Sequence, residues 1–283
     1  MDSNSRPQLV SAHWLEQHLD DASVVVLDAS FHLLTSGRDA AAEYRETHIP
    51  RAVFFDIDAI SDADNALPHM LPSESVFSAA CQALGINQNS TVVVYDTVGL
   101  FSAARAWWML EVFGHQRVAV LDGGLPRWQR DGRALDNTEV TPDRGDFVAT
   151  LDATRVRNLD QLLANLDQAH EQVVDARAAG RFNGTEPEPR PGMRSGHIPG
   201  AVNVPVSSLL DGATGLVHAN QVLEQLFVDA GAKLDKPVIT SCGSGVTACA
   251  LTLALSLIGK RDVSVYDGSW SEWGARPDTP IDC

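Results

Sequence analysis

The sequence predicts an α/β protein of two tandem domains, each a mainly parallel sheet flanked by helices. At 283 residues the chain is long enough for about two domains of ordinary size. Its composition, 44% hydrophobic and 20% charged, is typical of globular proteins. In both halves, short continuous apolar runs alternate with helical patterns, and such runs indicate strands that are buried on both faces of a sheet.

An internal repeat divides the chain. Four segments of the first half recur in the second half in the same order and at nearly one offset. Two copies of about 145 residues favour tandem domains over a solenoid, which needs three or more shorter units. The aligned pairs are VVVLDAS ending at Ser30 with VVDARA ending at Ala178, His48 with His197, Asp96 with Cys242, and Trp128 with Trp273, at offsets between 145 and 149.

The first half contains five well-marked elements. Its helices each end at a glycine, which is the usual residue for the left-handed cap that closes a helix. In chain order we expect a strand over 24–28, a helix over 74–84 closed by Gly85, a strand over 91–95, a helix over 102–113 closed by Gly114, and a strand over 118–121.

The second half repeats this order after a polar stretch that has no clear period. We therefore expect an amino-terminal domain over 1–140, a linker over 141–154 and a carboxy-terminal domain over 155–283. The expected elements of the second domain are strands over 172–175, 237–241 and 263–266, and helices over 221–230 and 246–258, the last closed by Gly259.

Charge and apolar patterning exclude several classes of protein. The net charge of −16 repels phosphate backbones, so we expect no nucleic-acid partner. The amino terminus lacks the apolar core of a signal peptide, and the longest apolar stretch, 248–258, is too short to span a bilayer. We therefore expect no membrane association and a cytoplasmic location. The four cysteines do not indicate a disulfide scaffold, no His/Cys spacing fits a zinc site, and no metal or cofactor is expected.

The strongest chemical signal is Cys242, which follows an apolar strand and precedes a Gly-rich turn and a helix. Gly243 and Gly245 allow backbone N–H groups to converge, and the helix adds its positive end, so a thiolate would be stabilised there. A thiolate is the nucleophilic form of cysteine. For an isolated cysteine, simple burial at a strand end is the commoner explanation. The flanking glycines favour chemistry here.

Two comparisons narrow the type of chemistry. Cysteine phosphatases carry an arginine six positions after the cysteine, and the residue there is Ala248, which makes phosphoryl transfer a poor alternative. The first half has Asp96 at the position aligned with Cys242. Because an aspartate cannot carry a transferable sulfur, we expect the first domain to be catalytically silent.

The tandem arrangement and the motifs HIPGA, CGSGVTA and YDGSWSEW resemble the two-domain rhodanese superfamily, over about residues 11–277. The loop resembles the 3-mercaptopyruvate sulfurtransferase branch. The thiosulfate-using branch typically has CRKGVTA, with two cations that hold an inorganic dianion. Gly243 and Ser244 replace those cations, which argues against thiosulfate as the best donor.

The resemblance implies a mechanism and a set of site residues. Cys242 would attack the sulfur of 3-mercaptopyruvate, release pyruvate and become a persulfide, from which a thiol such as thioredoxin, or cyanide, would remove the outer sulfur. The resemblance assigns Cys242, Ser244, His69 and Asp58 as catalytic residues, the last three as a hydrogen-bonded relay, and Arg181, Arg190, Gly243, Gly245, Val246 and Thr247 as substrate-binding residues.

Other readings remain open at the level of sequence. Arg181 and Arg190 could only neutralise the neighbouring Glu186 and Glu188, and Asp58 and His69 could serve packing or capping. The function could instead be that of a thiosulfate sulfurtransferase or of a persulfide carrier that does not turn over. A monomer would suffice if the first domain completes the site.

Overall fold

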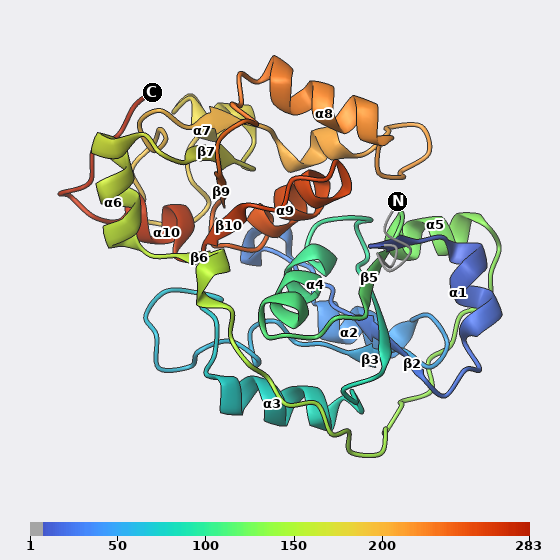
Figure 1. Ribbon diagram of the computed structural model, residues 1–283. Coiled ribbons are helices and arrows are strands. Elements are labelled where there is room, and N and C mark those ends of the chain that lie inside the picture. The colour runs from blue at the N-terminus through green and yellow to red at the C-terminus, as the bar shows by residue number, and fades with distance from the viewer. Residues whose placement is uncertain (1–7) are drawn as a thin grey trace. The chain divides into compact units, whose positions relative to one another are not determined.

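The computed structural model describes residues 8–283 and forms two compact units (Figure 1). The first unit runs to Ile60 and continues over Pro72–Leu151. The second consists of Asp152–Asp211 and His218–Cys283. Each unit also includes a short segment from the other half of the chain. Ser61–Leu71, which we call the first arm, belongs to the second unit, and Gly212–Val217, the second arm, belongs to the first unit.

The sheet of the first unit has five parallel strands in the order β1-β5-β4-β2-β3. Its helices connect successive strands, as parallel pairing requires. The strands are β1 (Leu9–Val10), β2 (Val24–Asp28), β3 (Val53–Phe54), β4 (Thr91–Tyr95) and β5 (Val118–Leu121), and the α-helices are α1 (Ala12–His18), α2 (Ala40–Glu46), α3 (Glu74–Ala83), α4 (Ala103–Val112) and α5 (Gly124–Arg130), with a 3₁₀ turn at Leu34–Ser36.

The sheet of the second unit repeats this order as β6-β10-β9-β7-β8, again with every pair parallel. The predicted architecture, two parallel sheets flanked by helices, is therefore confirmed. The strands are β6 (Val156–Arg157), β7 (Gln172–Asp175), β8 (Val202–Asn203), β9 (Val238–Ser241) and β10 (Val263–Tyr266), and the α-helices are α6 (Leu159–Gln168), α7 (Ala179–Phe182), α8 (Asn220–Asp229), α9 (Ala248–Leu257) and α10 (Ser269–Trp273), with 3₁₀ turns at Ala153–Arg155 and Val206–Leu209.

The central elements of each unit are buried on all sides. Strand β10 is fully buried, and helices α4 and α9 bury nearly every side chain, which matches their largely apolar sequences. The ends of the four predicted helices differ from the observed ones by at most two residues, within the usual uncertainty of helix ends. The long strands thus end where the loops that follow them carry Asp96 and Cys242.

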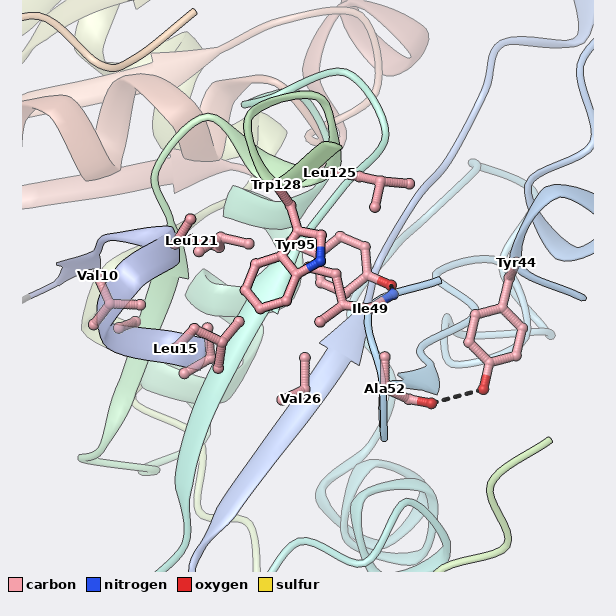
Figure 2. Close-up of a cluster of buried hydrophobic side chains, with 13 residues drawn as sticks. Val10, Leu15, Val26, Tyr44, Ile49, Ala52, Tyr95, Leu121, Leu125 and Trp128 are labelled. Atoms are coloured by element: carbon pink, nitrogen blue, oxygen red, sulfur yellow. Dashed lines mark hydrogen bonds between the residues drawn. The ribbon is translucent and has the colours of Figure 1, made fainter. Parts of the chain in front are cut away.

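One core cluster of the first unit lies between its sheet and the helices α1 and α5. Figure 2 shows Trp128 and Tyr95 among the side chains of Val10, Leu15 and Leu121. Tyr44 closes one side of the cluster, where its hydroxyl donates to the carbonyl of Ala52 at 2.7 Å. The buried aromatic rings fix the sheet against the helices, and so fix the strand ends from which the loops emerge.

The segment expected to be a linker packs against the first unit. Gly145 donates its backbone N–H to the carbonyl of Gln82 at 2.8 Å, and Thr150 donates to that of Phe113 at 2.9 Å. Between them Phe147 is fully buried and meets the ring of Phe77 edge-on. The first unit therefore extends to Leu151, beyond the boundary expected at residue 140.

Within residues 8–283, none of the helices has both the length and the apolarity to cross a bilayer. The same residues contain no cluster of three or more His, Cys, Asp or Glu side chains suited to a metal ion. The four cysteines, all of which lie in this range, form no disulfide; Cys81, Cys242 and Cys249 are buried, and Cys283 is exposed.

Candidate active site

Cys242 lies at the carboxyl end of β9, where ligands bind in open parallel sheets. Residues 242–247, here called the Cys242 loop, connect β9 to α9. Gly245 adopts a left-handed conformation with φ of 78°, which lets the loop turn sharply from strand to helix. The Cys242 residue is 2% exposed, so the thiol lies within the loop rather than on the surface.

Backbone hydrogen bonds hold Cys242 from both sides. Its carbonyl accepts the N–H of Trp270 at 3.0 Å, and its own N–H donates to the hydroxyl oxygen of Ser269 at 3.2 Å. The Ser269 hydroxyl in turn donates to the carbonyl of Tyr266 at 2.8 Å. The turn between β10 and α10 therefore fixes the position of the cysteine, a contact that sequence reasoning did not assign.

The aligned loop of the first unit, residues 96–102, shows what such a loop binds. Here the carboxylate of Asp96 accepts five backbone N–H groups at 2.7–2.9 Å. Five converging donors with a helix N-terminus make a strong anion site. The donors are the backbone N–H groups of Val98, Gly99, Phe101, Ser102 and Ala103.

The Cys242 loop resembles the Asp96 loop but has one residue fewer between its strand and its helix. In both loops the strand-end carbonyl accepts a backbone N–H, from Ala29 onto Tyr95 and from Ala176 onto Ser241, each at 2.9 Å. Gly99 and Gly245 are aligned, and both have positive φ. By this alignment the five donor positions of the first unit correspond to Ser244, Gly245, Val246, Thr247 and Ala248.

His69 and Ser244 meet within the second unit. Nδ1 of His69 lies 3.0 Å from the hydroxyl oxygen of Ser244, two residues past the cysteine. His69 belongs to the first arm, and it is only 5% exposed. Its backbone is left-handed, with φ of 61°, a conformation that costs energy for any residue with a β-carbon. An imidazole in hydrogen-bond contact with a hydroxyl can move a proton near neutral pH.

Asp58, the third member of the expected relay, belongs to the first unit. Its residue is exposed, and its backbone N–H donates to Oδ1 of Asp56 at 3.0 Å. A relay that includes Asp58 stays a prediction, whereas the pair of His69 and Ser244 is a feature of the second unit alone.

Two arginines border the loop. Arg190 donates to the hydroxyl of Ser244 at 3.4 Å and to that of Ser271 at 3.3 Å. A methyl group placed on Gly243 would lie 3.2 Å from Nη2 of Arg181 and 4.0 Å from Nη1 of Arg190. Gly243 therefore leaves room for the guanidinium of Arg181, and that of Arg190 lies close by. Beside the loop both groups can bind an anion that approaches Cys242.

Arg181 is paired with Glu188, one of the two acids that the sequence placed nearby. Nε and Nη2 of Arg181 both donate to Oε2 of Glu188, and the Glu188 side chain is only 3% exposed. Nη1 of Arg177 donates to the other carboxylate oxygen at 2.7 Å. Glu188 thus bridges two arginines, and the pairing of Arg181 with Glu188 that the sequence left open as an alternative is present in the structure.

The network continues into the core. Arg177 binds the carboxylate of Asp175 at the end of β7 through Nε to Oδ1 at 3.1 Å and Nη2 to Oδ2 at 2.7 Å, and its guanidinium stacks on Trp270 at 4.2 Å. Sequence reasoning missed Arg177, and it named Glu188 only as a neighbour of the other two arginines. The clustering of three arginines and two glutamates over 177–190 was the available signal.

The comparisons with known proteins follow the same division of the chain. The model of the rhodanese-like domain matches residues 11–131 and again residues 158–276. The chain belongs to the rhodanese family. The two matched segments are the two copies found in the sequence, and the second contains Cys242.

Several relatives in this family are similar along nearly the whole chain. The 3-mercaptopyruvate sulfurtransferase of Escherichia coli K12 is 45% identical, covering 96% of this chain and 97% of the relative. The human 3-mercaptopyruvate sulfurtransferase is 44% identical, and the match covers 96% of this chain and 94% of the human protein. Among solved structures, the 3-mercaptopyruvate sulfurtransferase SseA of E. coli is 42% identical with a TM-score of 0.85, covering 94% of this chain and 99% of that chain.

Proposed function

We propose that this rhodanese is a 3-mercaptopyruvate sulfurtransferase that carries sulfur on Cys242. The observation that carries the proposal is the placement of this cysteine in an anion-binding type of loop with Arg181 and Arg190 beside it. The relatives named 3-mercaptopyruvate sulfurtransferase support the choice of donor, because they match both domains.

The first half-reaction moves one sulfur atom and one pair of electrons. The thiolate of Cys242 attacks the sulfur of 3-mercaptopyruvate, and an S–S bond forms as the C–S bond breaks. The electron pair of the C–S bond passes to the carbon, which gives the enolate of pyruvate. The enolate takes up a proton to become pyruvate, and Cys242 is left as a persulfide.

The donor is recognised through its charge and its polarity. A guanidinium binds a carboxylate through two parallel hydrogen bonds, so Arg181 and Arg190 are suited to the carboxylate and ketone of the donor. His69 and Ser244, in contact at 3.0 Å, would handle the proton that moves between thiol and enolate.

The second half-reaction regenerates the Cys242 thiolate. A thiol acceptor such as thioredoxin or a small dithiol, or cyanide, attacks the outer sulfur of the persulfide and expels the Cys242 thiolate. The backbone N–H groups of Gly245, Val246 and Thr247 would stabilise the anion in both states, as the aligned groups stabilise the Asp96 carboxylate.

Thiosulfate is the alternative donor within the same fold. It is an inorganic dianion, and Gly243 and Ser244 bring no cation of their own to the Cys242 loop. We therefore expect kcat/KM to be higher for 3-mercaptopyruvate than for thiosulfate. A higher value for thiosulfate would reverse the assignment of the donor.

The carrier role of Cys242 is tested by mass spectrometry of the protein after proteolytic digestion. Incubation with 3-mercaptopyruvate and no acceptor should add the mass of one sulfur atom to the Cys242 peptide. The Cys242→Ser variant should remain folded, gain no mass and produce no pyruvate. Cys283→Ser, which removes the exposed thiol, is the matched control and should load normally. An unchanged mass in the wild-type protein would contradict the proposal.

A further inference from the structure

The two arms are equivalent parts of the repeat. Each lies just before a helix, α3 after the first arm and α8 after the second, and these helices begin and end 146 positions apart. At the same offset, Leu71 aligns with Val217. The N–H of Leu71 donates to Oδ2 of Asp267 at 2.8 Å.

The second arm repeats this contact in the first unit. The N–H of Val217 donates to Oδ1 of Asp122, also at 2.8 Å. Asp122 and Asp267 are themselves aligned, each following the last long strand of its unit and preceding a glycine. In each unit, therefore, one backbone N–H of the arm donates a hydrogen bond to the carboxylate of one aspartate.

The arms differ at the residue two positions before this contact. In the second arm it is Gly215, with φ of 71°, and in the first arm it is His69, with φ of 61°. Glycine adopts this conformation without strain, and histidine does not. A methyl group on Gly215 would meet no atom within 4 Å, so space does not account for the glycine. The strained histidine occurs only in the arm that reaches Ser244.

Strain of this kind persists only where the surrounding structure enforces it. Within the first arm, Asp62 donates its N–H to the carbonyl of Met70 at 2.9 Å, which closes the segment on itself. Its attachment at Leu71 is made to Asp267, which is 3% exposed. A carboxylate is a stronger acceptor of an N–H than a neutral group, and burial strengthens the contact.

We propose that Asp267 is a positioning residue that holds His69 in its left-handed conformation against Ser244. The inference rests on the proposed function, since it gives His69 its place in proton transfer. Asp267 acts through the backbone of Leu71. Asp122 makes the same contact in the unit whose loop has no cysteine, and so it serves as an internal reference.

The test compares Asp267→Ala with Asp122→Ala. Both variants should lose thermal stability to a similar extent, because both lose the same kind of contact. Asp267→Ala should lower kcat for 3-mercaptopyruvate at least tenfold with KM changed less than threefold, while Asp122→Ala stays within twofold of the wild-type kcat. Asp267→Asn keeps an oxygen acceptor and should recover most of the lost kcat. Equal losses of kcat in the two alanine variants would overturn the proposal.

A double-mutant cycle shows whether Asp267 acts through the histidine. In a His69→Ala background, Asp267→Ala should have almost no further effect on kcat, because the group that it positions is gone. A loss of the same size in both backgrounds would mean that Asp267 acts elsewhere, and it too would overturn the proposal.

Hydrogen exchange separates this proposal from the proposed function. The amide of Leu71 should be protected in the wild-type protein and exchange faster in Asp267→Ala, whatever the substrate. If the wild-type protein does not turn over 3-mercaptopyruvate but Leu71 loses protection in Asp267→Ala, the proposed function fails and the fastening of the arm stands. If protection is unchanged, the positioning role of Asp267 fails.

Discussion

The side chain of Asp96 shows how much a single residue can organise. Its two oxygens accept five backbone N–H groups, and the residue is fully buried. Without that carboxylate the same five donors would lack their acceptor inside the protein. Hydrogen bonds to a charged group contribute more than neutral ones, and orphaned buried donors are costly.

We expect Asp96→Ala to lower the free energy of unfolding by about 3–5 kcal/mol, in line with the loss of a buried charged hydrogen-bond network. Asp96→Asn, which keeps one oxygen, should fall between the wild type and Asp96→Ala. Urea unfolding followed by circular dichroism measures the free energy of unfolding of the three proteins. If Asp96→Ala unfolds like the wild type, the carboxylate does not hold the loop.

Arg181 is the residue at which charge recognition can be measured. We expect Arg181→Ala to reduce kcat/KM for 3-mercaptopyruvate by about 30- to 100-fold, the equivalent of about 2–3 kcal/mol for hydrogen bonds to a charged group. Arg181→Lys keeps the charge without the fork of donors and should fall between the two. Arg276→Ala, which breaks an exposed pair with Asp278, is the control and should leave kcat/KM unchanged.

Residue-scale features were predictable where the signal lies in one stretch of sequence. The Cys242 loop was identified because its cysteine, its glycines and the adjoining strand and helix are contiguous. The bridge from Arg177 through Glu188 to Arg181 was not, because which acid contacts which guanidinium depends on side-chain directions. His69 was named only through the family resemblance, since no local pattern places it 3.0 Å from Ser244.

At the scale of elements, the segment that ends the first unit is the main departure from expectation. Its polar sequence without helical or strand period was read as a linker, and it forms neither element. It is nevertheless anchored by its backbone and by one buried aromatic ring, that of Phe147. A single buried ring in an aperiodic segment leaves no periodic signal.

Phe147→Ala should lower the free energy of unfolding by about 3–5 kcal/mol, because it leaves a cavity under the segment. Val148, the next residue, is 64% exposed. Val148→Ala should therefore change the free energy of unfolding by less than about 0.5 kcal/mol. The two variants differ by one position in the chain, so chemical denaturation compares them directly. Similar values for both would show that the segment is not packed in solution.

The central strands and the helices α3, α4, α8 and α9 were predicted closely, and for a physical reason. The helices α1, α2, α5, α6, α7 and α10 were not predicted. In a parallel sheet covered on both faces, the central strands are mostly apolar, and the four predicted helices that cover them end at left-handed glycines. Short edge strands such as β3 and β8 have only two residues and make no comparable pattern, so they were not predicted.

At the scale of the whole molecule, stability should depend on pH through buried His115. Burial lowers the pKa of this imidazole, and its Nδ1 accepts the N–H of Arg117 at 3.2 Å, which requires the neutral form. The unfolded chain takes up the proton near pH 6.5. Below that pH the unfolded state binds more protons, so stability is lost as pH falls from about 6.5 toward the lowered pKa.

The comparison variant for this effect is His115→Asn. The difference in free energy of unfolding between the wild type and His115→Asn should be largest at pH 8 and should shrink as the pH falls from 7 to 5. Urea titrations at each pH give this difference directly. A difference that is constant over this range would exclude His115 as a source of acid sensitivity.

The Asp96 loop has a consequence for how the two halves respond to their surroundings. An acceptor that is covalently part of the polypeptide cannot dissociate, so this loop stays saturated at any concentration of dissolved solutes. In the Cys242 loop the aligned residue is a cysteine, whose sulfur would change its substituent at each step of the proposed transfer. The first loop therefore keeps the same acceptor throughout, whereas the thermal stability of the second unit should change with the state of Cys242.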